Sequence, residues 1–310
     1  MAPDRRRILI LGGDGQIAWE LRRTLACLGE VVAVGRRTAP HALDLEQPET
    51  IAPLIESLRP TWIVNAAAHT AVDKAETEVE AATRINAEGP GLLAQAASRI
   101  GALLVHYSTD YVFDGRGTRP YREDDTPNPQ GVYGRTKLEG ERAIDNAGGD
   151  YLILRTAWVY GARGQNFLRT MRRLAREREE LRVVADQRGA PTWSRHIAEA
   201  TAQVLAQLGD DRAAWHTQTG IYHLTSAGEA TWHAFAEAIV EHQRQREPVK
   251  VAQVTAIGTA DYPTPAKRPA YSVLDNDKLA TTFGVRLPDW REALRQVQEE
   301  LDDQQRDATA

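Results

Sequence analysis

Short apolar runs alternate with longer amphipathic stretches through the first half of the chain. The runs are apolar at nearly every position, which is typical of strands in a parallel sheet that helices cover on both faces. They are RILIL at 7–11, VVAV at 31–34, WIV at 62–64, ALLVHYS at 102–108 and YLILR at 151–155. We therefore predict an α/β fold built on a doubly wound parallel sheet.

The pattern loosens after Gly161. The segments predicted there are helices over 166–179, 194–208 and 230–243, apolar runs at 181–185 and 221–226, a proline-rich loop at 262–269 and a polar tail at 302–310. The composition of the tail predicts disorder. We predict a Rossmann-like domain of residues 1–160 plus roughly 192–222, and a smaller C-terminal α/β lobe of roughly 161–191 plus 223–310.

The composition limits the partners and the location. The 310 residues carry a net charge of −5, which argues against broad nucleic-acid binding. No run of about 20 apolar residues is present that can cross a bilayer, and the basic start leads into a first strand rather than a targeting segment. Cys27 is the only cysteine, so no intrachain disulfide can form. We expect a cytoplasmic protein.

A glycine-rich turn follows the first predicted strand. Gly12, Gly15 and Ala18 form a G-x-x-G-x-x-A pattern. Such glycines let backbone N–H groups approach a pyrophosphate at a helix N-terminus. An ordinary strand-to-helix turn is the alternative, because this pattern alone is weak. Its position at the first βα junction favours nucleotide binding.

The end of the second predicted strand indicates which dinucleotide binds. An acidic residue there would bind the ribose of NAD, but the chain has Arg36 and Arg37, whose guanidinium groups suit a phosphate. We therefore expect NADPH, with NADH as the alternative. A solvated arginine loop is the competing interpretation. Asp44 and Leu45 lie at a distance along the chain that suits contact with the adenine.

Tyr133 and Lys137 are four residues apart at the start of a predicted helix, so they share one face. A nearby ammonium stabilises a phenolate, and the pair can then act as acid and base. An amphipathic helix explains the same spacing. The strand that precedes it ends in Ser108 and Thr109, which bring a hydroxyl to the carboxyl edge of the sheet, where ligands bind in such folds.

Eight stretches spread over residues 12–290 closely resemble the dTDP-4-dehydrorhamnose reductase family, within the extended short-chain dehydrogenases/reductases. They are GGDGQIAWEL, VNAAAHTAVDKAE, HYSTDYVFDG, VYGRTKLEGE, LRTAWVYG, DQRGAPT, YPTPAKRP and LPDW. The resemblance implies NADPH-dependent reduction of the C4 keto group of a dTDP-sugar, with the C-terminal lobe binding the sugar nucleotide. Related dehydratases need a carboxylic acid after the Thr-Asp pair, and Tyr111 stands there.

The resemblance also implies roles for individual residues. The implied catalytic residues are Thr109, Tyr133 and Lys137; the cofactor would contact Gly15, Gln16, Ile17, Asp44, Leu45, Ala68, His69, Thr70, Tyr133 and Lys137; the sugar nucleotide would contact Thr109, Asp110 and Trp158. We expect His69 to make a backbone contact rather than to transfer a proton.

Three further side chains are candidates for substrate binding. An indole at Trp158 can stack on a sugar or a base, or it can be a buried cap between the lobes. Lys267 and Arg268 lie in the stiff proline-rich loop and suit a diphosphate, although both can equally be solvated surface charges.

One departure from the family bears on metal binding and assembly. In this family acidic side chains gather Mg²⁺ at a dimer interface, and the matching residues here are Glu20, Arg195 and Glu300. A fixed guanidinium would repel the ion. We therefore expect no metal at this site, and we expect Arg195 to pair with Glu20 and Glu300 instead. We also expect that the protein can form a homodimer. Three unrelated surface charges are the alternative.

Two other functions fit the sequence. One is a catalytically silent regulatory subunit that binds NADP, and the other is a reductase of a different dTDP-deoxysugar. The first would be indicated by loss of Tyr133 or Lys137, and both are present.

Overall fold

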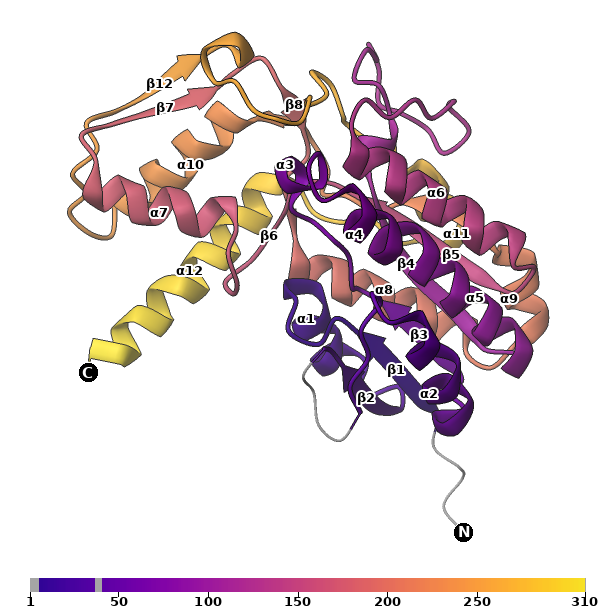
Figure 1. Cartoon of the computed structure of the whole chain (residues 1–310). Helices are drawn as coiled ribbons and strands as arrows, with labels where there is room; N and C mark the ends of the chain where they lie inside the picture. The colour runs from indigo at the N-terminus through magenta and orange to yellow at the C-terminus, as the bar shows by residue number, and fades with distance from the viewer. Residues whose placement is uncertain (1–5, 37–40, 310) are drawn as a thin grey trace.

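The computed structural model describes residues 6–36 and 41–309, and Arg37 lies outside the described residues (Figure 1). Its centre is a six-stranded sheet in the order β10-β5-β4-β3-β1-β2, with every pairing parallel. The strands are β1 (Arg7–Leu11), β2 (Glu30–Val34), β3 (Trp62–Asn65), β4 (Leu103–Thr109), β5 (Tyr151–Thr156) and β10 (Gly220–His223). The predicted doubly wound α/β fold is confirmed.

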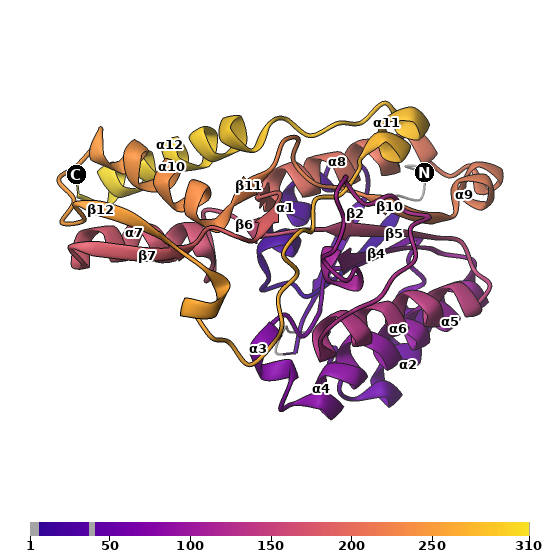
Figure 2. The ribbon, with the colours of Figure 1, turned by 90° about the horizontal axis from the view of Figure 1, so that it is seen from above.

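Helices cover both faces of this sheet (Figure 2). One layer contains α1 (Gln16–Thr24), α8 (Ser194–Leu208), α9 (Arg212–Gln218) and α11 (Asp277–Phe283). The other contains α2 (Ile51–Leu58), α5 (Gly89–Ile100) and α6 (Val132–Asn146). Along β1, Ile8 and Ile10 pack into the first layer while Leu9 and Leu11 pack into the second. Because both faces of β1 are buried, its residues from Ile8 to Leu11 are apolar without interruption.

A second, smaller core lies beside the sheet. It is formed by α7 (Phe167–Glu177), α10 (Trp232–Arg244), α12 (Trp290–Thr309) and the parallel pair β7 (Glu180–Val184) and β12 (Gln253–Ile257). The short helices α3 (Val72–Ala75) and α4 (Val79–Thr83) pack on α6. The short strands are β6 (Val159–Tyr160), which pairs with β9 (Thr192–Trp193), and β8 (Arg188–Gly189), which pairs with β11 (Ala230–Thr231). The domain boundaries stay a prediction. The α11 segment, which we placed with the lobe, contributes Leu279 and Phe283 to the core on the sheet.

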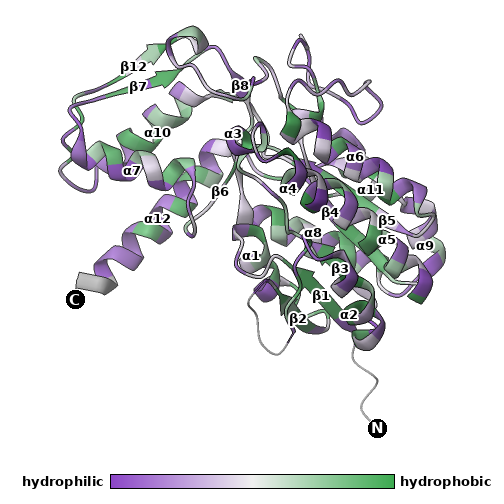
Figure 3. Cartoon of the chain, viewed as in Figure 1, coloured by the Kyte–Doolittle hydropathy of each residue, from purple (hydrophilic) through white to green (hydrophobic). Residues whose placement is uncertain are grey.

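The prediction of a disordered tail is wrong. Residues 302–309 continue α12, whose outer turns are strongly polar (Figure 3). Asp302 accepts a hydrogen bond from Arg172 at 2.6 Å and lies 3.0 Å from His242 Nε2. These partners come from α7 and α10, so the tail is ordered by contacts that its own composition does not indicate. No helix among the described residues has the length and apolarity needed to cross a membrane.

Candidate active site

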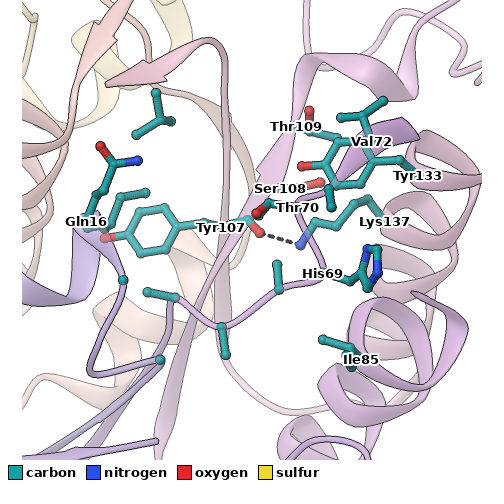
Figure 4. A pocket seen from close by; sticks show the side chains of 18 of the residues that line it. Gln16, His69, Thr70, Val72, Ile85, Tyr107, Ser108, Thr109, Tyr133 and Lys137 are labelled. Carbon is teal, nitrogen blue, oxygen red and sulfur yellow. Dashed lines mark hydrogen bonds between the residues drawn. The ribbon is translucent and has the colours of Figure 1, made fainter. Parts of the chain in front are cut away.

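A pocket of about 1080 Å³ opens at the carboxyl edge of the sheet, between the two cores (Figure 4). Most of the residues predicted from the sequence line it. They are Gly12, Gly15, Gln16, Ile17, Arg36, Asp44, Leu45, Ala68, His69, Thr70, Thr109, Asp110, Tyr133, Lys137, Trp158 and Arg268. One concave site therefore collects residues that are separated by more than 250 positions in the sequence.

The glycine turn is shaped to bring backbone close to a ligand. Gly12 has φ +81, and a Cβ there would lie 2.9 Å from the backbone of Ala66. Its carbonyl accepts a hydrogen bond from the N–H of Gly15 at 2.7 Å, and α1 begins at the next residue. Only glycine fits this position without strain. The tight turn ahead of a helix N-terminus fits a dinucleotide pyrophosphate.

The far end of the pocket suits the adenosine half of the cofactor. Arg36 is exposed there beside Asp44 and the buried Leu45. Asp44 accepts a hydrogen bond from the N–H of Glu46 at 3.0 Å, which fixes its carboxylate in the loop. Arg37, the second predicted phosphate ligand, lies outside the described residues.

Tyr133 and Lys137 project together from α6 into the pocket, as the spacing predicts (Figure 4). Burial raises the pKa of Tyr133 to about 12, while a hydrogen bond with Thr109 acts in the opposite direction. Burial lowers the pKa of Lys137 to about 8, against the attraction of Glu141. The Lys137 amine donates to the backbone carbonyl of Tyr107 at 2.7 Å. The site thus presents a neutral phenol beside an amine that titrates near neutral pH.

The two hydroxyls at the end of β4 have different surroundings. Ser108 donates to Glu141, whose carboxylate also binds Arg155 through contacts of 2.9 and 2.6 Å. The side chains of this ion pair are 1% and 2% exposed, so the Ser108 hydroxyl serves a buried structural network. Thr109 instead donates to Asp110 at 3.0 Å and hydrogen-bonds with Tyr133. Thr109 is therefore the hydroxyl available beside the phenol.

The carboxyl group of Asp110 is buried in the pocket wall. Burial raises its pKa to about 6, and hydrogen bonds from Ser272 and Thr109 offset part of this effect. Its Oδ2 has no hydrogen-bond partner among the described residues. Because Asp110 lines the pocket, its carboxyl group is a candidate acceptor for a ligand hydroxyl.

Two indoles form the wall that faces the smaller core. Trp158 has φ +45 and stacks on Trp232, with ring centroids 3.5 Å apart and planes inclined by 6°. Both line the pocket. A positive φ is unusual for so large a residue and marks a site of backbone strain. We did not predict Trp232, because its place at the start of a helix gives no signal of its contact with Trp158.

The two cations of the proline-rich loop, Lys267 and Arg268, differ in their position relative to the pocket. Arg268 lines the pocket and donates to Asp73 from both terminal guanidinium nitrogens, at 3.0 and 2.9 Å. Lys267 is exposed and is absent from the pocket lining, and its amine lies 3.5 Å from the side-chain amide oxygen Oε1 of Gln130. The geometry therefore favours Arg268 over Lys267 as a ligand for a diphosphate.

A bridge between the two cores also escaped prediction. Asn166 caps α7 by accepting a hydrogen bond from the N–H of Arg169, and its amide donates to Gln16 at 2.8 Å. Both Gln16 and Asn166 line the pocket. They are 150 positions apart, and no local pattern indicates the pairing.

His69 lies in the loop after β3 and lines the pocket. Its backbone N–H donates to Asn86 at 2.8 Å, and its ring Nε2 lies 2.8 Å from Glu78. The imidazole thus contacts the carboxylate of Glu78, the residue that precedes α4. This arrangement agrees with a supporting role in the loop rather than proton transfer.

Away from the pocket, Arg195 joins Glu20 on α1 to Glu300 on α12. The guanidinium lies 3.2 Å from Glu20 and 2.8 Å from Glu300. The predicted pairing with both carboxylates is therefore present. Burial acts to lower the pKa of Arg195, but the hydrogen bonds that Arg195 donates to Glu20 and Glu300 outweigh it, so the pKa lies above its ordinary value.

Known proteins resemble this chain over nearly its whole length. The sequence profile of the RmlD substrate binding domain matches residues 6–303. The dTDP-4-dehydrorhamnose reductase of Burkholderia thailandensis is 52% identical over 291 residues, which cover 93% of this chain and 96% of that protein. The enzyme of the same name from Escherichia coli K12 is 44% identical over 296 residues, with coverages of 95% and 97%.

Solved structures agree. A dTDP-4-dehydrorhamnose reductase from Clostridium acetobutylicum has a TM-score of 0.85 at 38% identity, covering 95% of this chain and 99% of that one. The Bacillus anthracis enzyme in complex with NADP has a TM-score of 0.85 at 33% identity, with coverages of 96% and 99%. The chain belongs to the dTDP-4-dehydrorhamnose reductase family.

Proposed function

We propose that this protein reduces the C4 keto group of dTDP-4-dehydro-β-L-rhamnose to give dTDP-L-rhamnose, with NADPH as the reductant and NADH as an alternative. The observation that carries the proposal is the meeting of Tyr133, Lys137 and Thr109 with the glycine turn in one pocket. Membership of the reductase family supports the same activity. We also propose a cytoplasmic location, which the single cysteine supports.

The cofactor fits the residues present. A Cβ at Gly12 or Gly15 would press on the backbone of Ala66 or on the Gly12 carbonyl, so these glycines permit the tight turn that brings backbone close to a pyrophosphate. Arg36, Asp44 and Leu45 line the region expected for the adenosine. The loop residues Ala68, His69 and Thr70 would contact the ribose and the nicotinamide. When bound, a reduced nicotinamide supplies the hydride to the carbonyl carbon.

Proton transfer is assigned to Tyr133. Its pKa of about 12 keeps the phenol protonated at neutral pH, so it has a proton to give to the oxygen of the ketone. Thr109 would hold the same oxygen by a hydrogen bond. Lys137, when charged, stabilises the phenolate that remains. The product is an alcohol, and solvent returns the lost proton to the site.

The sugar nucleotide would lie between the two cores. Trp158 and Trp232 offer an aromatic surface, Arg268 a guanidinium for the diphosphate, and Asp110 an acceptor for a sugar hydroxyl. We retain the division into an NADP-binding domain and a sugar-nucleotide-binding lobe as part of the proposal. A homodimer without nucleic-acid or membrane partners is also proposed, and the net charge of −5 supports the absence of nucleic acid.

Enzymatic conversion of dTDP-glucose tests the proposal. The purified protein is coupled to the upstream dehydratase and epimerase, and NADPH absorbance is followed. Loss of absorbance that requires both upstream enzymes supports the proposed substrate. Loss that requires only the dehydratase would indicate a reductase of another deoxysugar, and no loss would favour a silent NADP-binding subunit.

A further inference from the structure

A buried row of three side chains lies behind the amine of Lys137. Asn65 at the end of β3, His106 in β4 and Lys137 on α6 are each at most 1% exposed. Asn65 Nδ2 lies 3.0 Å from His106 Nδ1, and His106 Nε2 lies 3.0 Å from Lys137 Nζ. Neither Asn65 nor His106 is part of the pocket lining, so they reach the amine from behind.

The hydrogen bonds along this row determine which ring nitrogen of His106 carries the proton. The N–H of Ala67 donates to Asn65 Oδ1 at 3.1 Å, which leaves the amide nitrogen facing the imidazole. An amide nitrogen only donates, so Nδ1 must accept and the neutral ring is protonated on Nε2. A doubly protonated ring is disfavoured, because burial first and the charge of Lys137 second lower the pKa of His106 well below its ordinary value.

The Nε2 proton therefore points at the amine of Lys137. A neutral amine accepts it with its lone pair, whereas an ammonium has three donors and no acceptor. When Lys137 is charged, its ammonium and the Nε2–H of His106 are two donors that face each other. If His106 is instead protonated on Nδ1, that N–H faces the donor amide nitrogen of Asn65. If the Asn65 amide then rotates, its nitrogen faces the N–H of Ala67. Each arrangement leaves one buried hydrogen bond unmade.

We propose that His106, held in one tautomer by Asn65, is a positioning residue that disfavours the charged form of Lys137. The role of this device rests on the proposed reductase function, in which the charged form of Lys137 stabilises the Tyr133 phenolate; the row therefore limits how far the amine stays charged as the pH rises. Burial of the amine acts in the same direction and lowers its pKa to about 8. The other titratable groups of this region are Glu141 with its partner Arg155, Tyr133 and Asp110, and the carboxylate of Glu141 favours the charged form of the amine.

The tautomer can be observed directly in the unmodified, ligand-free protein. Nitrogen-15 NMR of histidine-labelled protein distinguishes Nε2–H from Nδ1–H and from imidazolium. The proposal predicts Nε2–H for His106 above pH 8, with the His106→Gln variant identifying the signal. A ring protonated on Nδ1 or on both nitrogens above pH 8 would overturn the proposal. Neither substrate nor turnover is needed, so failure here is distinct from failure of the proposed function.

The effect on Lys137 is measured by a lysine titration. The chain has only five lysines, Lys74, Lys137, Lys250, Lys267 and Lys278, so the Cε signals of lysine-labelled protein are few, and Lys137→Arg identifies the one of interest. In His106→Gln the side-chain carbonyl can accept from an ammonium, and we expect the titration midpoint of Lys137 to rise by about one unit. An unchanged or lowered midpoint in a folded variant would contradict the proposal.

A second variant separates the tautomer from simple charge. Asn65→Asp offers a carboxylate that can accept from both Ala67 and Nδ1–H, which would turn Nε2 into an acceptor for the ammonium. The added negative charge of Asn65→Asp raises the titration midpoint of Lys137 whether or not His106 is present. We therefore expect a larger rise from Asn65→Asp in the wild-type chain than in the His106→Gln chain, and equal rises would show that His106 does not transmit the effect.

Discussion

Arg268 and Asp73 form a two-point ion pair at the edge of the pocket, with N–O distances of 3.0 and 2.9 Å. The hydrogen bond from Arg268 is the main reason that the pKa of Asp73 lies below its ordinary value. The pair orients the guanidinium before any substrate arrives. A diphosphate that binds there would share a preorganised planar donor, which Lys cannot reproduce.

This arrangement predicts a difference between neighbouring cations. Arg268→Gln should raise the KM for the sugar nucleotide about tenfold or more, since a charge-assisted pair contributes roughly 1.5 to 3 kcal/mol. Lys267→Gln is the matched control, and its KM should stay within about twofold because the side chain lies outside the pocket lining. Steady-state kinetics measure both KM values. Equal increases in the two variants would mean that the loop acts only through its overall charge.

The stacked indoles predict a specific loss of substrate binding. Trp232→Ala removes the surface against which Trp158 packs, so the KM for the sugar nucleotide should rise by roughly tenfold, in line with the strength of aromatic stacking. The dissociation constant for NADPH, measured by fluorescence, should be unchanged. Trp232→Phe retains a ring and should lose much less. A weakening of NADPH binding in Trp232→Ala would contradict this assignment.

The Arg195 cluster predicts stability that does not depend on metal. Arg195→Gln leaves the nearly buried Glu20 with Arg23 as its remaining cation, so the free energy of unfolding should fall by about 1 to 3 kcal/mol. Urea denaturation measures this change. EDTA should alter neither the midpoint nor the oligomeric state of the wild-type protein, and dissociation of an oligomer by EDTA would refute the replacement of the ion.

Lys137 predicts an unusual dependence of stability on pH. Its pKa is about 8 in the folded protein against 10.5 for an ordinary lysine, so the unfolded chain binds more protons between these values and stability rises with pH across that window. At pH 7 the buried charge costs about 3 kcal/mol. Lys137→Met should therefore be most stabilising near pH 7 and progressively less so towards pH 9.5. A difference that is constant with pH would show that the amine titrates normally.

The sheet was predictable because its central strands β1, β3, β4 and β5 are buried on both faces, and their apolar composition reflects that burial. The glycine turn and the pairing of Tyr133 with Lys137 were predictable for a similar reason, since both depend on residues a few positions apart. The order of α12 was not, because Asp302 depends on Arg172, 130 positions earlier. The contact of Trp232 with Trp158 and the row behind Lys137 also come from tertiary packing. The choice between Ser108 and Thr109 required the position of Glu141, which engages Ser108.

The central claim is that the phenol of Tyr133 gives its proton to the reduced ketone. Tyr111 is a matched comparison, because its ring packs edge-on against Tyr133 with centroids 5.6 Å apart, and both rings belong to the same pocket. The most direct measurement is the single-turnover rate of NADPH oxidation in Tyr133→Phe and Tyr111→Phe at saturating substrate. We predict a loss of about two to four orders of magnitude in Tyr133→Phe with unchanged NADPH affinity, and a rate within about fivefold of wild type in Tyr111→Phe. A Tyr133→Phe enzyme that keeps the wild-type rate would contradict the account.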